Sequence, residues 1–161
     1  MIQQMVINMD KKKRLLFLII FSFIIDFISK RVAIYFLSEK ESSVLIPRFF
    51  SFTLAKNTGG AFSILSDNVP IIIILSLFII YILFSALKKD GYNNFELVCY
   101  SLIIGGAFGN LFDRVFYGYV VDFLDFYIFG YDYPVFNFAD IFIVVGIIGL
   151  FIDGFRKGDG R

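Results

Sequence analysis

The sequence predicts a mainly α-helical membrane protein, with four transmembrane helices and a small β element on the outer face. Of the 161 residues, 58% are hydrophobic and 23 are Phe, and the mean hydropathy of +0.80 exceeds what the mixed surface of a soluble domain tolerates. A bilayer span takes about 20 residues at a rise of about 1.5 Å per residue. Four apolar runs are long enough, at about residues 15–36, 70–87, 95–112 and 138–155.

The first apolar run follows KKKR at 11–14 and contains Asp26 and Lys30. It is too long for a secretory signal peptide, so we interpret it as a retained span. Asp26 and Lys30 are four residues apart, so on a helix they share one face and can form an ion pair. Two roles stay open for this pair, a structural contact between helices and a direct part in a site.

The segment after the first run predicts the β element. From Phe50 to Asn57, large apolar residues alternate with small or polar ones, and this period of two indicates a strand. The turn AKNTGGAF follows, and Val120 to Tyr127 is a second β-prone segment. We expect a small outer sheet with one apolar face on the membrane surface.

The second and third runs are joined by the short turn KKDGYNN at 88–94, so we expect two antiparallel neighbours. The third run ends in GGAFGNLFDR, residues 105–114. Its Gly105 and Gly109 form a small-xxx-small pattern that lets another helix approach closely. Asn110, Asp113 and Arg114 share one helix face by their spacing, which predicts a polar cluster at the outer end of the helix.

The basic residues predict the orientation. They gather before the first run, between the second and third, and after the fourth: Lys11, Lys12, Lys13, Arg14, Lys88, Lys89, Arg156, Lys157 and Arg161. The positive-inside rule then places both termini in the cytoplasm and residues 37–69 and 113–137 on the outer face. Since no repeat or low-complexity linker interrupts the chain, we expect a single membrane-embedded domain over residues 1–161.

Composition excludes several function classes. The net charge is only +1, so no basic excess points to nucleic acid. The single cysteine, Cys99, allows no intrachain disulfide. Histidine is absent, which removes Ser-His and Cys-His nucleophile pairs and the usual His/Cys zinc sets. Catalysis in this chain would rest on Asp, Glu, Lys, Tyr or Ser.

Asp140 lies at the start of the fourth run, and Asp122 and Asp125 precede it with no basic residue between Asp122 and Asp140. A charge at the centre of a span costs roughly 2.5–3.5 kcal/mol on insertion scales, so such an acid is a candidate site residue. Two carboxylates in a low-dielectric site cannot both ionise, and they share a proton as an aspartic protease dyad does. One acid then activates water while the other protonates the scissile carbonyl, which makes Asp122 and Asp140 the candidate catalytic pair.

Three other functions are alternatives to an aspartic protease. A small proton-coupled transporter or channel would use Asp26, Lys30 and Asp140 as a relay, and its acids would be distributed across the membrane. A Ser-Lys protease would need Ser29 and Lys30, but adjacent helical residues point about 100° apart. A binding protein without catalytic activity stays open as the third alternative.

These residues resemble the lipoprotein signal peptidases (signal peptidase II) of bacteria over nearly the whole chain. The resemblance is carried by ordered motifs: DxxxK at Asp26 and Lys30, NxGxAF at Asn57, Gly59, Ala61 and Phe62, GNxxDR at Gly109 to Arg114, GxVVDFxD at Gly118 to Asp125, and FNxAD at Phe136 to Asp140.

The resemblance implies an intramembrane aspartic endopeptidase that cleaves signal peptides from diacylglyceryl-modified prolipoproteins just before the lipidated cysteine. Its catalytic acids correspond to Asp122 and Asp140. Its substrate-binding or site-supporting positions correspond to Asp26, Lys30, Asn57, Gly59, Asn110, Asp113, Arg114 and Asn137.

The resemblance also implies a multi-pass protein of the bacterial cytoplasmic (inner) membrane with its site near the outer face. We expect a monomer in contact with membrane lipids, without metal or cofactor, and the resemblance implies sensitivity to globomycin-type inhibitors. Two positions depart from the family's usual pattern. Gly60 stands where alanine is usual and Ile141 where serine is common, and we expect activity to survive both.

Overall fold

The structure is a computed structural model that describes residues 2–37, 42–60, 68–88 and 91–158. Ala61 and Phe62 of the predicted turn, together with Lys89 and Arg161, lie outside the described residues. Four helices are present in the described part: α1 (Ile2–Phe36), α2 (Val69–Lys88), α3 (Asn94–Tyr117) and α4 (Phe138–Gly158). An antiparallel sheet accompanies them, made of β1 (Ser42–Ile46), β2 (Phe50–Asn57), β3 (Val120–Ile128) and β4 (Tyr131–Asp132).

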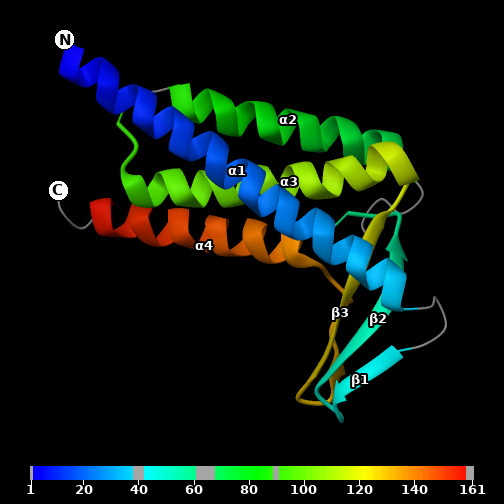
Figure 1. Ribbon diagram of the computed structural model, residues 1–161. Coiled ribbons are helices and arrows are strands. Elements are labelled where there is room, and N and C mark those ends of the chain that lie inside the picture. Colours follow the sequence, from blue (N-terminus) through cyan, green and yellow to red (C-terminus); the bar gives the residue numbers. More distant parts are fainter. Residues whose placement is uncertain (1, 38–41, 61–67, 89–90, 159–161) are drawn as a thin grey trace.

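Helix α3 is the centre of the bundle and packs against each of the other three helices. Both termini lie at one end of the bundle, and the sheet projects from the opposite end (Figure 1). The close approach depends on the predicted small residues, because a Cβ at Gly105 would meet Ser22 and one at Gly109 would meet Asp26, both on α1. Gly106 faces Ala139 of α4 in the same way. The expectation that these glycines admit neighbouring helices is confirmed.

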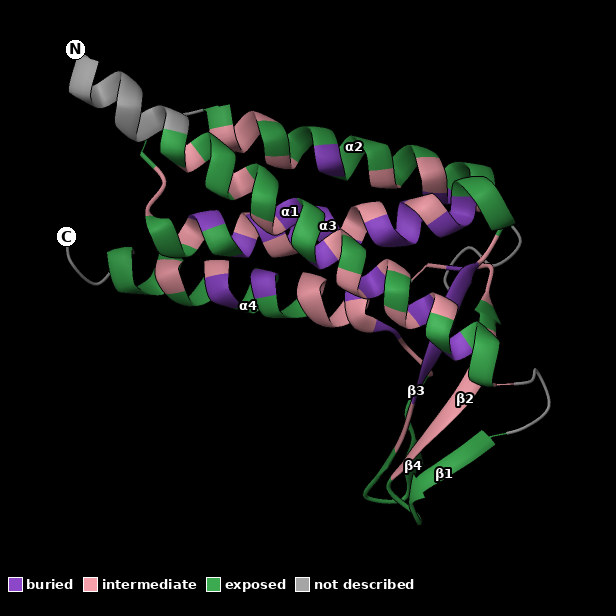
Figure 2. Cartoon of the chain, viewed as in Figure 1, coloured by how far each residue is buried: buried purple, intermediate pink, exposed green. Residues whose placement is uncertain are grey.

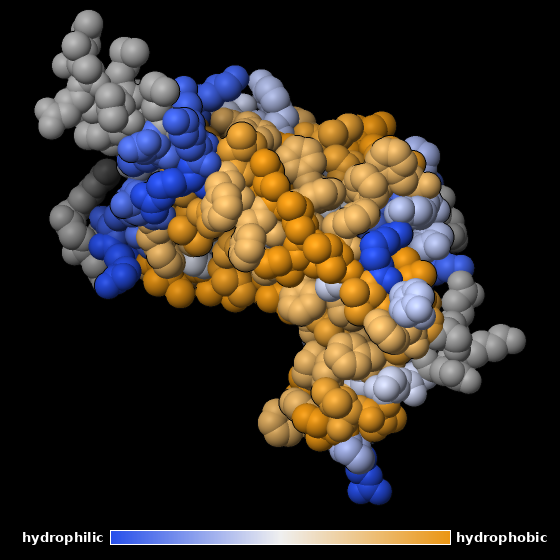
Figure 3. Space-filling model, viewed as in Figure 1, coloured by the Kyte–Doolittle hydropathy of each residue, from blue (hydrophilic) through white to orange (hydrophobic). Residues whose placement is uncertain are grey.

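Three of the described helices, α2, α3 and α4, are by themselves long and apolar enough to cross a membrane. The first predicted span is not among them, because Asp26, Lys30 and Arg31 lie within it. Asp26 and Lys30 are buried in the protein, so α1 completes the helical bundle without presenting these two charges to lipid. A broad hydrophobic surface covers the helices, and hydrophilic residues gather at the end that holds the termini (Figure 3).

Burial concentrates on α3 and on the first part of β3 (Figure 2). Val120 to Leu124 are all buried, whereas the end of β3 is exposed. A cluster of Ala33, Phe123 and Leu124 joins α1 to the sheet, with aromatic rings packed around it. The base of the sheet is therefore fixed to the helices.

The predicted strand at 50–57 is β2, and the β-prone segment from Val120 is β3. They pair antiparallel, with Ala55 opposite Asp122 and Asn57 opposite Val120. Strands β1 and β4 were not anticipated from the sequence, because each is short and lies at an edge of the sheet. The pairing of β2 with β3 places the end of β2, with Asn57, next to the part of β3 that carries Asp122.

Candidate active site

The carboxyl group of Asp122 lies at the buried base of β3, and the residue is 2% exposed. Its Oδ1 accepts a hydrogen bond from Asn137 Nδ2 at 2.6 Å, and its Oδ2 accepts one from Asn57 Nδ2 at 2.9 Å. Both carboxylate oxygens thus face amide donors from other elements.

Asp140 lies in the first turn of α4 and is partly buried. Its Oδ1 accepts from Asn110 Nδ2 at 2.8 Å, and its Oδ2 accepts from the backbone N–H of Asn137 at 3.1 Å. The backbone N–H of Asp140 donates in return to Asn137 Oδ1 at 3.1 Å. This is the reciprocal geometry of a helix capping box, and the helix N-terminus favours a negative charge at this position.

Asn137 connects the two predicted acids. It is completely buried, its side chain donates to Asp122, and its backbone donates to Asp140. It also donates to Asn110 Oδ1 at 3.1 Å. The acids therefore share one amide residue, although one lies on a strand and the other on a helix.

Burial and, after it, the negative charge of Asp140 raise the pKa of Asp122 to about 7, against the lowering effects of the hydrogen bonds from Asn57 and Asn137 and of the charge of Lys30. Near neutral pH, Asp122 is therefore protonated in a large fraction of molecules. An ordinary aspartate is almost fully ionised at the same pH.

The charges around the acids balance when one proton is shared. The cations are Lys30, Arg31 and Arg114, and the carboxyl groups are those of Asp26, Asp113, Asp122 and Asp140. Charges in a low-dielectric interior are stable only when they are compensated. One proton among the four carboxyl groups makes the set neutral, and the raised pKa of Asp122 makes that group its holder.

Asp26, Lys30 and Asp113 form a buried ionic cluster beside the acids. Lys30 Nζ lies 2.8 Å from Asp26 Oδ2, 3.1 Å from Asp113 Oδ2 and 2.9 Å from Asn110 Oδ1. The ion pair predicted between Asp26 and Lys30 is confirmed. The polar face predicted on the third helix is confirmed as well, because Asn110 and Asp113 both reach this cluster.

The turn after β2 is tied to α3 through Arg114. Arg114 Nη2 donates to the carbonyl oxygen of Gly59 at 2.6 Å, and Asn57 Oδ1 accepts from the backbone N–H of Gly59 at 2.9 Å. The side chain of Asn57 therefore holds the turn with its Oδ1, while its Nδ2 donates to Asp122. The predicted site residues thus belong to one connected network of polar contacts with Asp122 and Asp140.

Two further residues stand differently from what sequence reasoning suggested. Asp125 accepts a hydrogen bond from Thr53 Oγ1 at 2.6 Å within the sheet, and this contact does not link it to Asp122 or Asp140. Arg31 was not singled out, yet its Nη2 lies 3.2 Å from Asp113 Oδ1, and its guanidinium lies 4.6 Å from the ring centre of Tyr117. The sequence signal that could have indicated Arg31 is that it directly follows Lys30.

An apolar pocket of about 390 Å³ adjoins Asp140. It lies between the sheet and the outer side of α4, and Asp140 is its acidic member. Ile141, at the departure from the usual pattern, lines this pocket and packs on the apolar cluster of the sheet. The lining residues are Phe126, Ile128, Tyr133, Phe136, Asp140, Ile141, Val144 and Val145.

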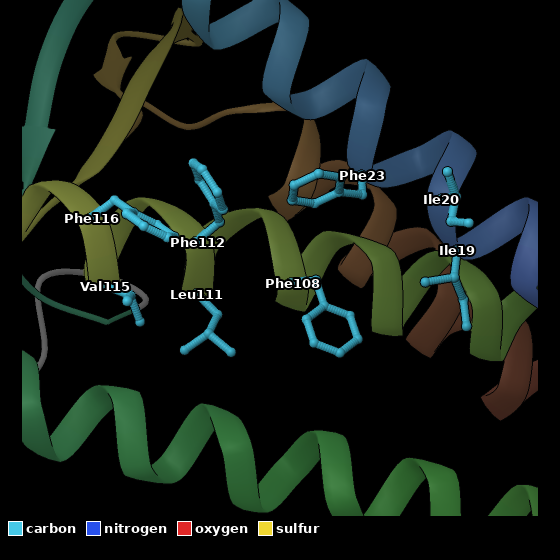
Figure 4. Close-up of a pocket in the computed structure, with 8 residues that line it drawn as sticks. All are labelled: Ile19, Ile20, Phe23, Phe108, Leu111, Phe112, Val115 and Phe116. Carbon is cyan, nitrogen blue, oxygen red and sulfur yellow. The ribbon is translucent and has the colours of Figure 1, made fainter.

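A second hollow of about 440 Å³ lies along α1 and α3 and contains only apolar residues, among them Phe23, Phe112 and Val115 (Figure 4). It offers no group for acid–base chemistry. The pocket beside Asp140 therefore differs from this hollow, because it combines apolar walls with a carboxylate.

Comparison with known proteins identifies the family. Residues 18–156 match the family model described as signal peptidase (SPase) II. The lipoprotein signal peptidase of Actinobacillus succinogenes is 38% identical, with 95% of this chain and 98% of the relative covered. That of Clostridium novyi is 41% identical, covering 88% of this chain and 97% of the relative.

A solved bacterial membrane enzyme, determined by the in meso method at 2.3 Å resolution, superposes with a TM-score of 0.86 at 35% identity. The superposition covers 92% of each chain. With a family match over most of its length and relatives of this similarity, the chain belongs to the signal peptidase II family.

Proposed function

We propose that Asp122 and Asp140 are the catalytic pair with which this chain cleaves prolipoproteins. As a member of its family the chain is an aspartic signal peptidase of prolipoproteins, a hydrolase of the membrane. The observation that carries the residue assignment is the bridge through Asn137, which contacts Asp122 with its side chain and Asp140 with its backbone. The cut lies just before the diacylglyceryl-modified cysteine.

The two acids have different protonation states and therefore different roles. Asp122, with a pKa of about 7, holds the proton, and Asp140 at the start of α4 carries the charge. Asp140 takes a proton from water while the resulting hydroxide attacks the scissile carbonyl carbon. Asp122 gives its proton to the carbonyl oxygen in the same step.

Collapse of the tetrahedral intermediate breaks the carbon–nitrogen bond. Asp140 passes its new proton to the leaving nitrogen, and Asp122 regains a proton from the hydroxyl that becomes the carbonyl of the new acid. Each acid ends in its starting state, so the pair is ready for the next substrate.

The orientation in the membrane follows from the basic residues. Lys88 and Lys157 lie at the ends of α2 and α4, and Arg14 contacts Asn94 at the start of α3. These helix ends face away from the sheet, and the acids lie at the opposite end of the bundle, at the base of β3 and the start of α4 (Figure 1). The positive-inside rule then makes the termini cytoplasmic and the acids close to the outer face of the bacterial inner membrane. A lipid-anchored substrate presents its scissile bond at that depth.

The clustering of charged groups disfavours the relay alternative. Asp26 and Lys30 are connected to Asp140 through Asn110 in one compact cluster at the sheet end. A relay across the membrane would distribute such groups along the bundle. The chain works as a monomer on this proposal, since all groups of the site come from one chain, and it is inhibited by globomycin-type cyclic peptides that occupy the acids.

The first experiment is cleavage of a diacylglyceryl-modified prolipoprotein by the purified protein in detergent, with Asp122→Asn and Asp140→Asn beside it. Both variants should lose cleavage and keep their fold. Asp125→Asn is the matched control, because it removes an acid three residues along the same strand that contacts Thr53 instead. An inactive parent protein would revive the non-catalytic homologue, and an active Asp122→Asn or Asp140→Asn variant would remove that residue from the pair.

The apolar pocket beside Asp140 is the proposed place for an apolar part of the substrate. Val144→Phe fills this pocket and should raise KM, because it occupies the space next to the acids. Val115→Phe places the same side chain in the hollow of Figure 4 and should leave KM unchanged. Equal KM values for both variants would assign the substrate to another surface.

A further inference from the structure

Lys30 bridges two buried carboxylates. Its ammonium group has three N–H donors and makes three contacts, to Asp26 Oδ2, Asp113 Oδ2 and Asn110 Oδ1 at 2.8, 3.1 and 2.9 Å. The side chain is 1% exposed, and both acids are equally buried. Water therefore does not screen these charges, and the geometry of the bridge is tightly held.

Each bridged carboxylate also holds the backbone just before one of the proposed catalytic acids. Asp26 Oδ1 accepts from the backbone N–H of Ala139 at 2.9 Å, and Ala139 precedes Asp140. Asp113 Oδ2 accepts from the backbone N–H of Val121 at 3.2 Å, and Val121 precedes Asp122. The first contact anchors the start of α4, and the second anchors the base of β3.

Lys30 also reaches Asp140 through an amide. Because Lys30 Nζ donates to Asn110 Oδ1, the Asn110 amide is oriented with its nitrogen toward Asp140, where Nδ2 donates to Oδ1 at 2.8 Å. A charged donor on the carbonyl side strengthens the amide's own donation. One ammonium group thus acts on both catalytic segments.

We infer that Lys30 is a positioning residue that fixes the separation of Asp122 and Asp140 through Asp26 and Asp113. The inference rests on the proposed function of the two acids. Without the bridge, no group draws the side chains of residues 26 and 113 together, and the Ala139 and Val121 anchors can move apart. The bridge therefore sets the spacing in which a shared proton and a single water molecule work together.

The spacing has a measurable electrostatic consequence. Part of the raised pKa of Asp122 comes from the nearby charge of Asp140, so a wider separation lowers that pKa toward its ordinary value. The charged groups that face the pair from the packed elements are Asp26, Lys30 and Arg31 of α1 and Asp113 and Arg114 of α3, and β2 adds the neutral amide of Asn57.

The test removes the bridge without leaving an unpaired charge. The double variant Asp26→Asn with Lys30→Met deletes one acid and one base, Asp113 keeps Arg31, and the new amide oxygen at position 26 still accepts from Ala139. We expect kcat to fall about 10²-fold, the effect of a misplacement of about 1 Å, with KM little changed. The basic limb of the pH–rate profile is read in Asp113→Asn, which opens the bridge but keeps the Lys30 charge that itself lowers the pKa of Asp122, and this limb should move to lower pH.

Lys157→Met is the matched control. Lys157 Nζ also bridges two carboxylates, those of Glu96 and Asp153 at 2.8 and 2.9 Å, but at the far end of the bundle. Its loss should leave kcat and the basic limb unchanged. Cleavage by the parent protein, abolished by Asp122→Asn, establishes the function independently of the bridge.

The outcome is decided by the limb and by kcat together. A double variant with the parent's kcat, and only a lower melting temperature, would make Lys30 a structural ion-pair partner and overturn the inference. Asp113→Asn keeps the Asp26–Lys30 pair and leaves an oxygen for Val121, so it also serves if the double variant does not fold. An unchanged limb in that variant overturns the inference equally.

Discussion

Asn137 and Asp140 hold each other at the start of α4, each donating its backbone N–H to the other's side-chain oxygen at 3.1 Å. Asn93 and Glu96 form the same reciprocal box at the start of α3. In both boxes the asparagine amide reaches a carboxylate on another element, Asp122 in the first and Asp153 in the second. The difference is that the first box contains a proposed catalytic acid.

Replacing Asn137 by alanine should lower both stability and activity. The helix cap is lost, which costs about 0.5–2 kcal/mol, and the contact that fixes Asp122 is lost with it. We expect a lower melting temperature together with a large fall in kcat in the prolipoprotein cleavage assay.

Asn93→Ala separates these effects, because it removes an equivalent cap at the cytoplasmic-side turn of the proposed topology. Its melting temperature should fall by a similar amount, while kcat stays at the parent's value. Equal losses of kcat in Asn93→Ala and Asn137→Ala would mean that the caps act on activity through stability alone.

The activity should fall as pH rises through about 7, because Asp122 must carry a proton to act as the acid. The measurement is kcat/KM of the parent across neutral pH in one detergent. Activity that stays constant well above the pKa of Asp122 would assign the proton donor to a different group.

Stability should follow the same ionisation. The pKa of Asp122 is about 7 in the folded chain against an ordinary value of 3.8, so between these values the folded state holds a proton that the unfolded state releases. The free energy of unfolding therefore decreases as pH rises through this window. Unfolding of the parent and of Asp122→Asn, compared at about pH 5 and about pH 8, should show a smaller decrease in the variant.

The sequence predicted those features that depend on local pattern. Hydropathy located the helices, alternation located β2, and the unneutralised acids suggested the candidate catalytic pair. Residue alternation along β3 also explains Asp125, because residues three apart on a strand point to opposite faces, which separates it from Asp122. That signal was present in the sequence.

Other features depend on contacts between distant segments and have no local signature. Arg31 pairs with Asp113 because α1 crosses α3 at a register set by Gly105 and Gly109. The two-residue strand β4 exists because Phe129 and Gly130, both with positive φ, reverse the chain after β3. Pairing of such short edges follows from the fold as a whole.

Arg114→Lys should reduce kcat/KM. The guanidinium binds the Gly59 carbonyl at 2.6 Å while it lies buried at the end of α3, and lysine offers a shorter reach and no planar fork. Loss of a hydrogen bond to a charged group is worth about 1.5–3 kcal/mol, which corresponds to a reduction of about tenfold or more. Arg48→Lys, at the exposed β1–β2 turn, should leave kcat/KM unchanged. A parent-like Arg114→Lys variant would show that the Gly59 turn is held without this contact.

Gly109→Ala should damage the site through packing. A Cβ at position 109 would meet the carboxylate of Asp26, so α1 must move or Asp26 must leave its contacts with Lys30 and Ala139. Overpacking of this kind costs about 1–3 kcal/mol. We expect both the melting temperature and kcat to fall, measured by thermal unfolding and prolipoprotein cleavage.

Gly154→Ala on α4 should change the melting temperature in the opposite direction from Gly109→Ala. No described atom lies within 4 Å of a Cβ at this exposed position. Alanine in a helix is favoured over glycine by about 0.5–1 kcal/mol, so this variant should melt at a higher temperature with kcat unchanged. If Gly109→Ala were stabilised as Gly154→Ala is, α1 and α3 would not approach as closely at Asp26 as the structure has them, and the ionic bridge of Lys30 would lose its steric support.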